Sequence, residues 1–362
     1  MACPKRPDFQ EALGLCETAG LEVVEVVPMC RRPHPATYVG PGRLERIKEL
    51  VEEKGAEVVV VYGNPKPSQI YRIMRDLKVE VIDRTSLILK IFELHAGSEE
   101  AKLQTELARL KYELTMAREY IRTVKKGEQV FFLGPGEYAV DYVIKAIHRR
   151  MKKIEDKLER IRKMREQQKS RRLQKLKIPE IAIAGYTCAG KTALLNSLSK
   201  LRLKEGAEMF TTVLPKHARV WVDGEEGIFV DTVGFIESVP PQIVEAFHAT
   251  LSEIAYSDAV ILVIDSSESK KRVIDKTLSS LETLANIGVI AKPLIVALNK
   301  VDLAQDWQDK AKEISEVIGG YYDRFEGLVP ISAKTGYNVK VLAKKAIQVA
   351  KRERLSLEEV EG

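Results

Sequence analysis

The chain has 362 residues, of which 45% are hydrophobic and 30% charged, and its formal net charge is +6. This length and composition indicate a globular protein of two or three domains. No apolar run in the sequence reaches the ~18 residues needed to span a bilayer, and the N-terminus lacks an apolar signal segment, so we expect a cytoplasmic protein with no membrane partner. The four cysteines have no paired spacing and no neighbouring histidine, which argues against a disulfide framework or a zinc site.

Residues 1–97 alternate amphipathic helical segments with short β-rich runs. The β-rich runs are GLEVVEVV, AEVVVVYG and VEVID, and the helical segments between them include GRLERIKELVEEKG and PSQIYRIMRDL. This alternation predicts a small α/β subdomain with mostly parallel strands.

Residues 98–177 change to a pattern of apolar residues spaced by three and four. Two such seams, separated by a glycine-containing stretch, predict two long helices in an antiparallel coiled-coil hairpin. The first seam contains Leu103, Leu107, Leu110, Leu114, Ala117, Ile121 and Val124, and the second contains Val140, Ile144, Ile147, Met151, Ile154, Leu158 and Ile161.

Basic charge is concentrated in the second half of this hairpin. The segment from Arg149 to Lys177 has fourteen basic and four acidic residues, a net charge of +10, whereas the remainder of the chain carries −4. A charged helix face is usually only solvated, but this imbalance favours an anionic partner, with nucleic acid ahead of membrane. The candidate RNA contacts are Arg149, Lys153, Arg160 and Lys163 on the helix and Phe131 and Phe132 at the tip, where aromatic rings could stack on bases.

Residues 178–362 begin with a buried strand, IPEIAIAG, followed by a phosphate-binding loop. The segment Gly185–Thr192 fits G-x-x-x-x-G-K-[ST], in which backbone N–H groups surround the phosphates of a nucleotide. Lys191 is expected to reach the β- and γ-phosphates, and the Thr192 hydroxyl to bind Mg²⁺. The predicted nucleotide-binding residues of this loop are Gly185, Tyr186, Thr187, Cys188, Ala189, Gly190, Lys191, Thr192 and Ala193.

Three further motifs follow in the order expected of a GTP-binding α/β domain. The strand GIFVDTVG places Asp231 near the metal and the Gly234 N–H near the γ-phosphate. The motif NKVD supplies Asn299, Lys300 and Asp302, and the Asp302 carboxylate can accept two hydrogen bonds from guanine. The loop after LVPI supplies Ser332, Ala333 and Lys334, with the Ala333 N–H toward the guanine carbonyl. Each motif follows a strand, where α/β sheets bind ligands, so we predict a GTP site.

With these motifs in place, the chain resembles the HflX family of ribosome-associated GTPases. The resemblance rests on GYTCAGKT, FTTVLP, DTVGFIESVPPQIVEAFHATLSEI and NKVD, and outside the G domain on TYVGPGRLERIKEL, VEVIDRTSLILKIFELHA and EAKLQTELARLKYEL. It covers nearly the whole chain and implies an N-terminal α/β subdomain, a helical hairpin and a Ras-like P-loop G domain. By motif position Thr212, or its neighbour Thr211, is the switch I threonine, so Thr212 would join Thr192 at the Mg²⁺ and act in catalysis with Lys191 and Gly234.

The resemblance also implies a function. It indicates a monomeric, GTP-hydrolysing switch that binds the large ribosomal subunit and its RNA and splits or rescues ribosomes. Phe235 stands where Ras-like enzymes carry a glutamine that orients the attacking water, and a hydrophobic residue there is usual in this family, so hydrolysis is expected to be slow unless the ribosome stimulates it. Two alternatives are an RNA- or ribosome-binding module with vestigial hydrolysis and a signalling GTPase that acts on a protein partner.

Overall fold

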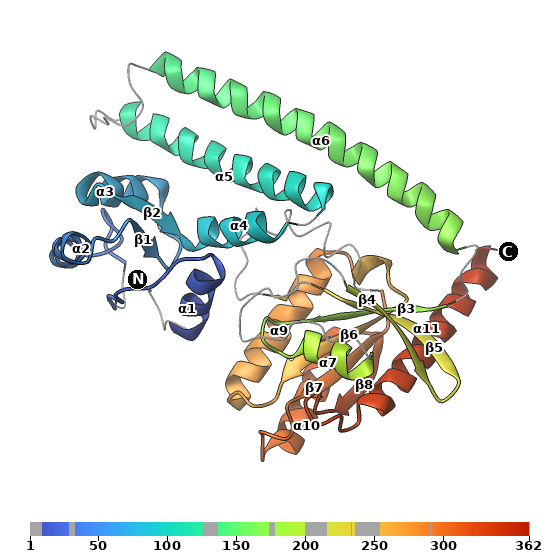
Figure 1. Ribbon diagram of the computed structural model, residues 1–362. Helices are drawn as coiled ribbons and strands as arrows, with labels where there is room; N and C mark the ends of the chain where they lie inside the picture. The colour runs from blue at the N-terminus through green and yellow to red at the C-terminus, as the bar shows by residue number, and fades with distance from the viewer. Residues whose placement is uncertain are drawn as a thin grey trace. The chain divides into compact units, whose positions relative to one another are not determined.

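The structure is a computed structural model, and it divides at Lys163 into two compact units (Figure 1). No helix among the described residues is both long enough and apolar enough to cross a membrane. The described residues are 9–28, 33–96, 98–125, 137–173, 178–199, 216–232, 234–235, 254–289 and 291–361.

The first unit starts with a small α/β subdomain built on two parallel strands. Its core contains nine buried residues from the strands, the helices and the segment before α2, among them Tyr38, Ile73 and Val81. The chain turns sharply after α2 at Gly55, whose φ of +63° favours glycine. The elements in order are α1 (Phe9–Thr18), α2 (Pro41–Lys54), β1 (Val58–Val61), α3 (Pro67–Leu77), β2 (Glu80–Asp83) and α4 (Arg84–His95).

One predicted strand does not form. The run GLEVVEVV, residues 20–27, is rich in β-branched valines, but residues 21–28 have no strand pairing in the structure. Val23 and Val24 are exposed, and a cavity of about 380 Å³ lies between this segment and β1. β-Branched composition alone does not pair a strand, because the pairing also needs backbone hydrogen bonds to a neighbour.

Beyond the carboxyl ends of β1 and β2, the subdomain buries a cluster of polar side chains. Arg84 Nη2 donates to Glu11 Oε1 over 2.9 Å, and the Tyr62 hydroxyl donates to the same oxygen over 2.6 Å. Tyr112 of the next helix donates to Asp83 Oδ2 over 2.6 Å. Burial, together with the adjacent Glu11 carboxylate, raises the pKa of Tyr62, so the phenol stays protonated and acts as a donor.

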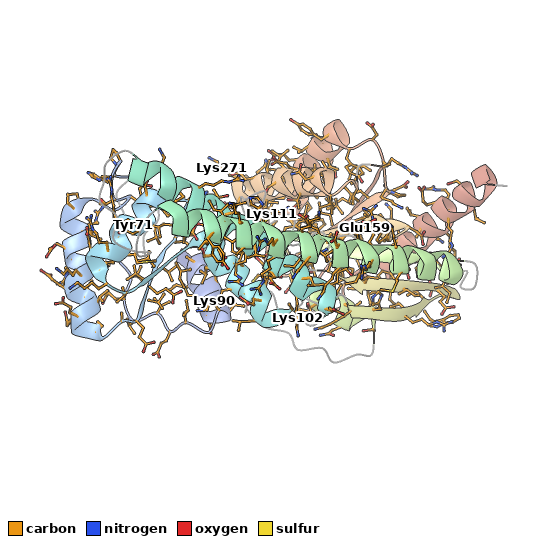
Figure 2. The ribbon with its side chains drawn as sticks, turned by 90° about the horizontal axis from the view of Figure 1, so that it is seen from above. Tyr71, Lys90, Lys102, Lys111, Glu159 and Lys271 are labelled. Atoms are coloured by element: carbon orange, nitrogen blue, oxygen red, sulfur yellow. The ribbon has the colours of Figure 1, made fainter. Side chains whose placement is uncertain are left out.

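The hairpin helices are α5 (Glu99–Lys125) and α6 (Glu137–Leu173), which run antiparallel in Figure 1. Ten of the predicted seam residues pack together, and Arg150 pairs with Glu106 across the two helices. Of the other predicted seam residues, the side chains of Ile121, Val124 and Val140 lie outside the described part of the chain, and Ala117 is half-buried. Figure 2 shows charged side chains on both helices, including Lys102 and Lys111 on α5 and Glu159 on α6. The buried seam residues are Leu103, Leu110, Leu114, Ile147 and Ile154, with Leu107, Ile144, Met151, Leu158 and Ile161 packed against them.

The second unit is a six-stranded sheet in the order β4-β5-β3-β6-β7-β8, in which only β4 and β5 pair antiparallel. β3 lies between β5 and β6, so successive crossovers leave it on opposite sides, and the crevice at its carboxyl end is where such sheets bind ligands. The strands are β3 (Glu180–Gly185), β4 (Lys216–Val222), β5 (Glu225–Asp231), β6 (Ala259–Asp265), β7 (Leu294–Asn299) and β8 (Phe325–Pro330).

Helices cover both faces of this sheet. α7 and α11 pack together on one face, and α9 and α10 on the other (Figure 1). β3, β6 and β7 are buried almost throughout, which is why their sequences are continuous apolar runs. The helices are α7 (Lys191–Leu198), α9 (Lys270–Asn286), α10 (Trp307–Tyr321) and α11 (Val339–Glu361).

Candidate functional site

The loop between β3 and α7 has the tight backbone that its glycines predict. Gly185 has φ +141°, and a Cβ there would lie 2.3 Å from the Val263 carbonyl oxygen. Gly190 has φ +96°, and a Cβ there would lie 2.3 Å from Asn299 Nδ2. Only glycine fits either position, so the loop can bring its backbone close to phosphates at the start of α7.

Lys191, the first residue of α7, is buried. Its ammonium donates to the Tyr186 carbonyl oxygen over 2.8 Å. Burial lowers the pKa of Lys191 to about 8, while the Asp231 carboxylate and the Cys188 thiol act in the opposite direction. The lysine is therefore held at the loop with its charge poorly solvated, and the phosphates of a nucleotide would stabilise that charge.

Thr192 and Asp231 are brought together from α7 and the end of β5. Thr192 Oγ1 donates to Asp231 Oδ2 over 2.8 Å, and Asp231 is fully buried. A hydroxyl and a carboxylate are oxygen donors of the kind that Mg²⁺ prefers, and this metal keeps several waters alongside few protein ligands. The pair fits a magnesium site shared with phosphate oxygens.

Asn299, at the end of β7, joins three motifs that are far apart in the sequence. Its Nδ2 donates to the Ala189 carbonyl oxygen over 2.8 Å, and its Oδ1 accepts from the Ala333 N–H over 2.9 Å. The side chain is 2% exposed, so both bonds form away from water. The phosphate-binding loop and the predicted base-reading loop are thereby held on one side chain.

The remaining residues predicted to read the base lie around this link. Lys300 has φ +63°, and its ammonium donates to Asp265 Oδ2. Ser332 is buried and its Oγ accepts from the Thr335 N–H over 3.2 Å, which shapes the loop. Asp302 and Lys334 are exposed, so the carboxylate predicted to read guanine is accessible to a ligand.

Gly234 and Phe235 lie directly against the phosphate-binding loop. A Cβ on Gly234 would lie 2.9 Å from Thr187 Cα and 2.9 Å from Lys191 Nζ, so only a glycine lets the backbone come this near to the loop. The Phe235 N–H donates to Gly185 O, and Phe235 O accepts from the Thr187 N–H, both over 2.9 Å. The Phe235 side chain is buried, so this residue anchors the segment after Asp231 and does not face solvent.

The other predicted loop residues contribute mainly backbone or surface. Ala189 is buried, and Thr187 and Ala193 are half-buried. Cys188 is exposed on a backbone with φ +62°.

The predicted RNA contacts divide into two groups. Arg149, Lys153, Arg160 and Lys163 are exposed on α6, and within the described part of the chain the first three form no ion pair, whereas Lys163 pairs loosely with Glu159. The tip residues Phe131 and Phe132 and the threonine pair Thr211 and Thr212 lie outside the described residues.

Sequence reasoning missed the groups behind the loop. The Tyr186 ring packs toward α9, where Ser279 and Lys276 meet it, and Asp265 pairs with Lys300. A serine and a lysine three residues apart on an amphipathic helix are too ordinary to signal this contact.

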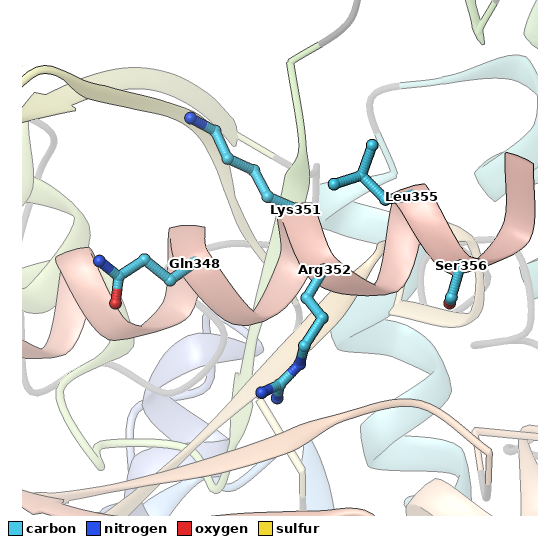
Figure 3. Close-up of a pocket in the computed structure, with 5 residues that line it drawn as sticks. All are labelled: Gln348, Lys351, Arg352, Leu355 and Ser356. Carbon is cyan, nitrogen blue, oxygen red and sulfur yellow. The ribbon is translucent and has the colours of Figure 1, made fainter.

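A second hollow lies along α11, but it does not bring together side chains from different elements. Figure 3 shows the five residues that line it, and all belong to this one helix. Lys351 pairs with Glu225 and Arg352 pairs with Glu326, so the charges at the hollow are used within the fold.

Known protein families match successive parts of the chain. The family described as "GTP-binding GTPase N-terminal" matches residues 6–93, "GTP-binding GTPase Middle Region" matches residues 95–172, and "50S ribosome-binding GTPase" matches residues 180–300. "GTPase HflX" of Hyperthermus butylicus is 43% identical over 345 residues, which cover 93% of this chain and 91% of that protein. "GTPase HflX" of Escherichia coli is 34% identical over 307 residues, which cover 84% of this chain and 71% of that protein.

Solved structures of GTP-binding proteins also match nearly the whole chain. A crystal structure of SsGBP in complex with GDP is 36% identical, with a TM-score of 0.60, and the match covers 97% of this chain and 98% of that one. A GTP-binding protein from Sulfolobus solfataricus in complex with GDP is 35% identical, with a TM-score of 0.57 and the same coverage.

Proposed function

The chain belongs to the HflX family of GTPases, and from this membership we propose that it is a GTP-driven switch whose target is the large ribosomal subunit. GTP hydrolysis follows from the family. The observation that supports the nucleotide site is the meeting of Lys191, the Thr192–Asp231 pair and the Asn299 link at the carboxyl ends of β3, β5 and β7.

We assign each group a role on these contacts. Lys191 would stabilise the β- and γ-phosphates, Thr192 would hold Mg²⁺, and Asp231 would orient that hydroxyl and the metal's waters. Mg²⁺, when bound, would neutralise charge on the phosphates. The Gly234 N–H would donate to the γ-phosphate, and Thr212 would be a second residue that holds the metal. The proposed nucleotide-binding residues are Gly185, Tyr186, Thr187, Cys188, Ala189, Gly190, Lys191, Thr192, Ala193, Asp231, Gly234, Asn299, Lys300, Asp302, Ser332, Ala333 and Lys334.

We assign residues 1–97, 98–177 and 178–362 to an α/β subdomain, a hairpin and a G domain, of which the hairpin carries the RNA-binding charge. The family description of residues 180–300 as a 50S ribosome-binding GTPase supports the partner. The exposed Arg149, Lys153 and Arg160 support the choice of α6 as the RNA-binding surface, because each presents a cation with no ion-pair partner among the described residues. We propose that the protein acts as a monomer in the cytoplasm and that bound ribosomes accelerate hydrolysis and are then split.

The test combines hydrolysis with sedimentation. Wild type and a variant with Arg149, Lys153, Arg160 and Lys163 changed to glutamate are sedimented with purified large subunits across a salt series, with a non-hydrolysable GTP analogue. Wild-type affinity should fall with salt, with a slope of roughly −0.7 to −0.9 per phosphate contacted, and the variant should bind more weakly with a flatter slope. GTP turnover of wild type should rise when large subunits are added.

The matched control reverses Arg46, Lys54, Arg75 and Lys78, which gives the same change in net charge at exposed positions of the same unit. It should co-sediment like wild type. If the α6 variant also co-sediments like wild type at every salt concentration, the basic face is only solvated and the hairpin assignment is wrong. If large subunits leave wild-type turnover unchanged, the ribosome-stimulated switch is excluded.

A further inference from the structure

The Tyr186 side chain fills the space between the phosphate-binding loop and α9. Its hydroxyl donates to Ser279 Oγ over 2.9 Å, and Lys276 Nζ lies 5.3 Å from the centroid of its ring. Lys276 in turn pairs with Glu268, with 2.5 Å between Nζ and Oε1. The Tyr186 ring is therefore held both by its hydroxyl and on one face, and the residue is 7% exposed.

The cavity beside this ring has a volume of about 20 Å³. That volume holds about one water molecule and no organic ligand. The contacts of the ring with α9 therefore serve the protein itself and are not part of a second binding site.

The backbone of Tyr186 faces the other way, toward the reacting groups. Its carbonyl oxygen accepts the Lys191 ammonium over 2.8 Å. Tyr186 also forms a parallel bridge with Phe235, closed by the Thr187 N–H donating to Phe235 O over 2.9 Å. Tyr186 thus contacts α9 with its side chain. With its backbone it contacts Lys191 and the segment after Asp231.

We propose that Tyr186 is a positioning residue of the GTPase reaction, which places the Lys191 ammonium and the Phe235 backbone at a location set by α9. The inference rests on the nucleotide site proposed above. The effect of Lys191 on the reaction depends on the position of its ammonium. A displacement of about 1 Å at a catalytic group can lower the rate about a hundredfold. A partner that moved α9 would then change GTP turnover without touching the nucleotide.

The experiment removes each half of the Tyr186–Ser279 contact and compares the effects. Tyr186→Phe and Ser279→Ala each delete one partner of the same hydrogen bond, and the double variant deletes both. Tyr322→Phe is the matched control, because its buried hydroxyl donates to the Val289 and Lys292 carbonyl oxygens elsewhere in the same unit. Steady-state kcat and KM for GTP, GDP affinity and the thermal midpoint are measured for each.

The expected result is a split between the kinetic constants. Both single variants should lower kcat by about two- to tenfold, the range of one lost hydrogen bond, while KM for GTP stays within twofold of wild type. The double variant should lose no more than either single one, because both changes break the same contact. Tyr322→Phe should lower the thermal midpoint at unchanged kcat, since a purely structural hydroxyl alters only the stability.

Two results would overturn the inference. The first is a kcat within twofold of wild type in both single variants, and the second is a loss of kcat that is simply additive in the double variant. Lys191→Ala, assayed alongside, separates this failure from a failure of the site. If Lys191→Ala abolishes turnover while the Tyr186 variants do not lower it, the site stands and only the positioning role falls. If Lys191→Ala keeps wild-type turnover, the site assignment and the positioning role both fall.

Discussion

In the first unit, the chain leaves β1 with Tyr62 and β2 with Asp83 and Arg84. Arg84 donates to Tyr62, both donate to Glu11, and Asp83 accepts from Tyr112. In the second unit, the ends of β3, β5 and β7 lead to glycine-rich backbone, an ammonium and a carboxylate, with the Asp302 carboxylate exposed. Both sheets present polar residues where parallel strands end, and the strand-end position alone does not make a ligand site. A site also needs donors and acceptors that the fold leaves directed at a ligand.

The largest effect is expected from a substitution in the buried polar cluster of the first unit. Arg84→Met should leave the Glu11 carboxylate buried without its cation and lower the free energy of unfolding by about 3–5 kcal/mol. GTP turnover per folded molecule should not change. Urea unfolding followed by circular dichroism measures the first effect, and a GTPase assay on the folded fraction the second.

The double change Arg84→Met with Glu11→Leu should recover part of that loss, because it removes the unpaired charge. A drop in GTP turnover with unchanged stability would contradict the comparison. The strand ends of the first unit would then belong to a ligand site.

Next in size is the loss of the ammonium in the second unit. Lys191→Ala should reduce turnover by about 10²- to 10³-fold, or about 2.7–4 kcal/mol, the usual cost of one preorganised electrostatic donor. Lys351→Ala removes a lysine of the same unit that pairs with Glu225, and should leave the rate intact. Single-turnover hydrolysis of labelled GTP is the measurement, and equal rates in both variants would remove Lys191 from the chemistry.

A smaller effect concerns the choice of base. Asp302→Asn should weaken GTP binding by about 1.5–3 kcal/mol, the value of hydrogen bonds to a charged group, and should favour xanthosine triphosphate. Asp309→Asn on α10 makes the same charge change at another exposed carboxylate. Competition titrations with both nucleotides decide the point, and retained guanine preference in Asp302→Asn would assign base reading to another group.

The smallest effect is a dependence on pH. Because burial holds the pKa of Lys191 at about 8, kcat/KM for GTP should fall about tenfold per pH unit above that value as the free protein loses the ammonium. The folded pKa lies below the usual 10.5, so the unfolded chain binds more protons between pH 8 and 10.5. The contribution of this residue to stability therefore rises with pH over that window.

Lys191→Arg provides the control, since a guanidinium does not deprotonate in this range. The alkaline fall in kcat/KM should be absent from that variant. A fall of the same size in Lys191→Arg would show that a different group titrates.

The sequence predicted those parts of the site that lie within one short segment. The phosphate-binding loop depends on glycines at fixed spacing, so its backbone conformation could be inferred from residues 185–192 alone, and the heptad seams likewise predicted the packing of α5 against α6. The Asn299 link and the Tyr186–Ser279 contact could not be inferred, because each joins segments that only the tertiary fold brings together. The strand predicted at residues 20–27 was wrong because a run of β-branched residues records a local preference and not whether a neighbour is in hydrogen-bonding reach.

The Asn299 link has a consequence for the order in which the protein is made. Its carboxamide is satisfied only when Ala189 lies on one side and Ala333 on the other. Synthesis proceeds from the N-terminus, so a nascent chain that has emerged as far as β7 has the loop and the asparagine but not the N–H that fixes them. GTP affinity should therefore arise late in translation, after residues near 333 have left the exit tunnel. An unfinished chain would then be unable to enter its own nucleotide cycle on the ribosome that is making it.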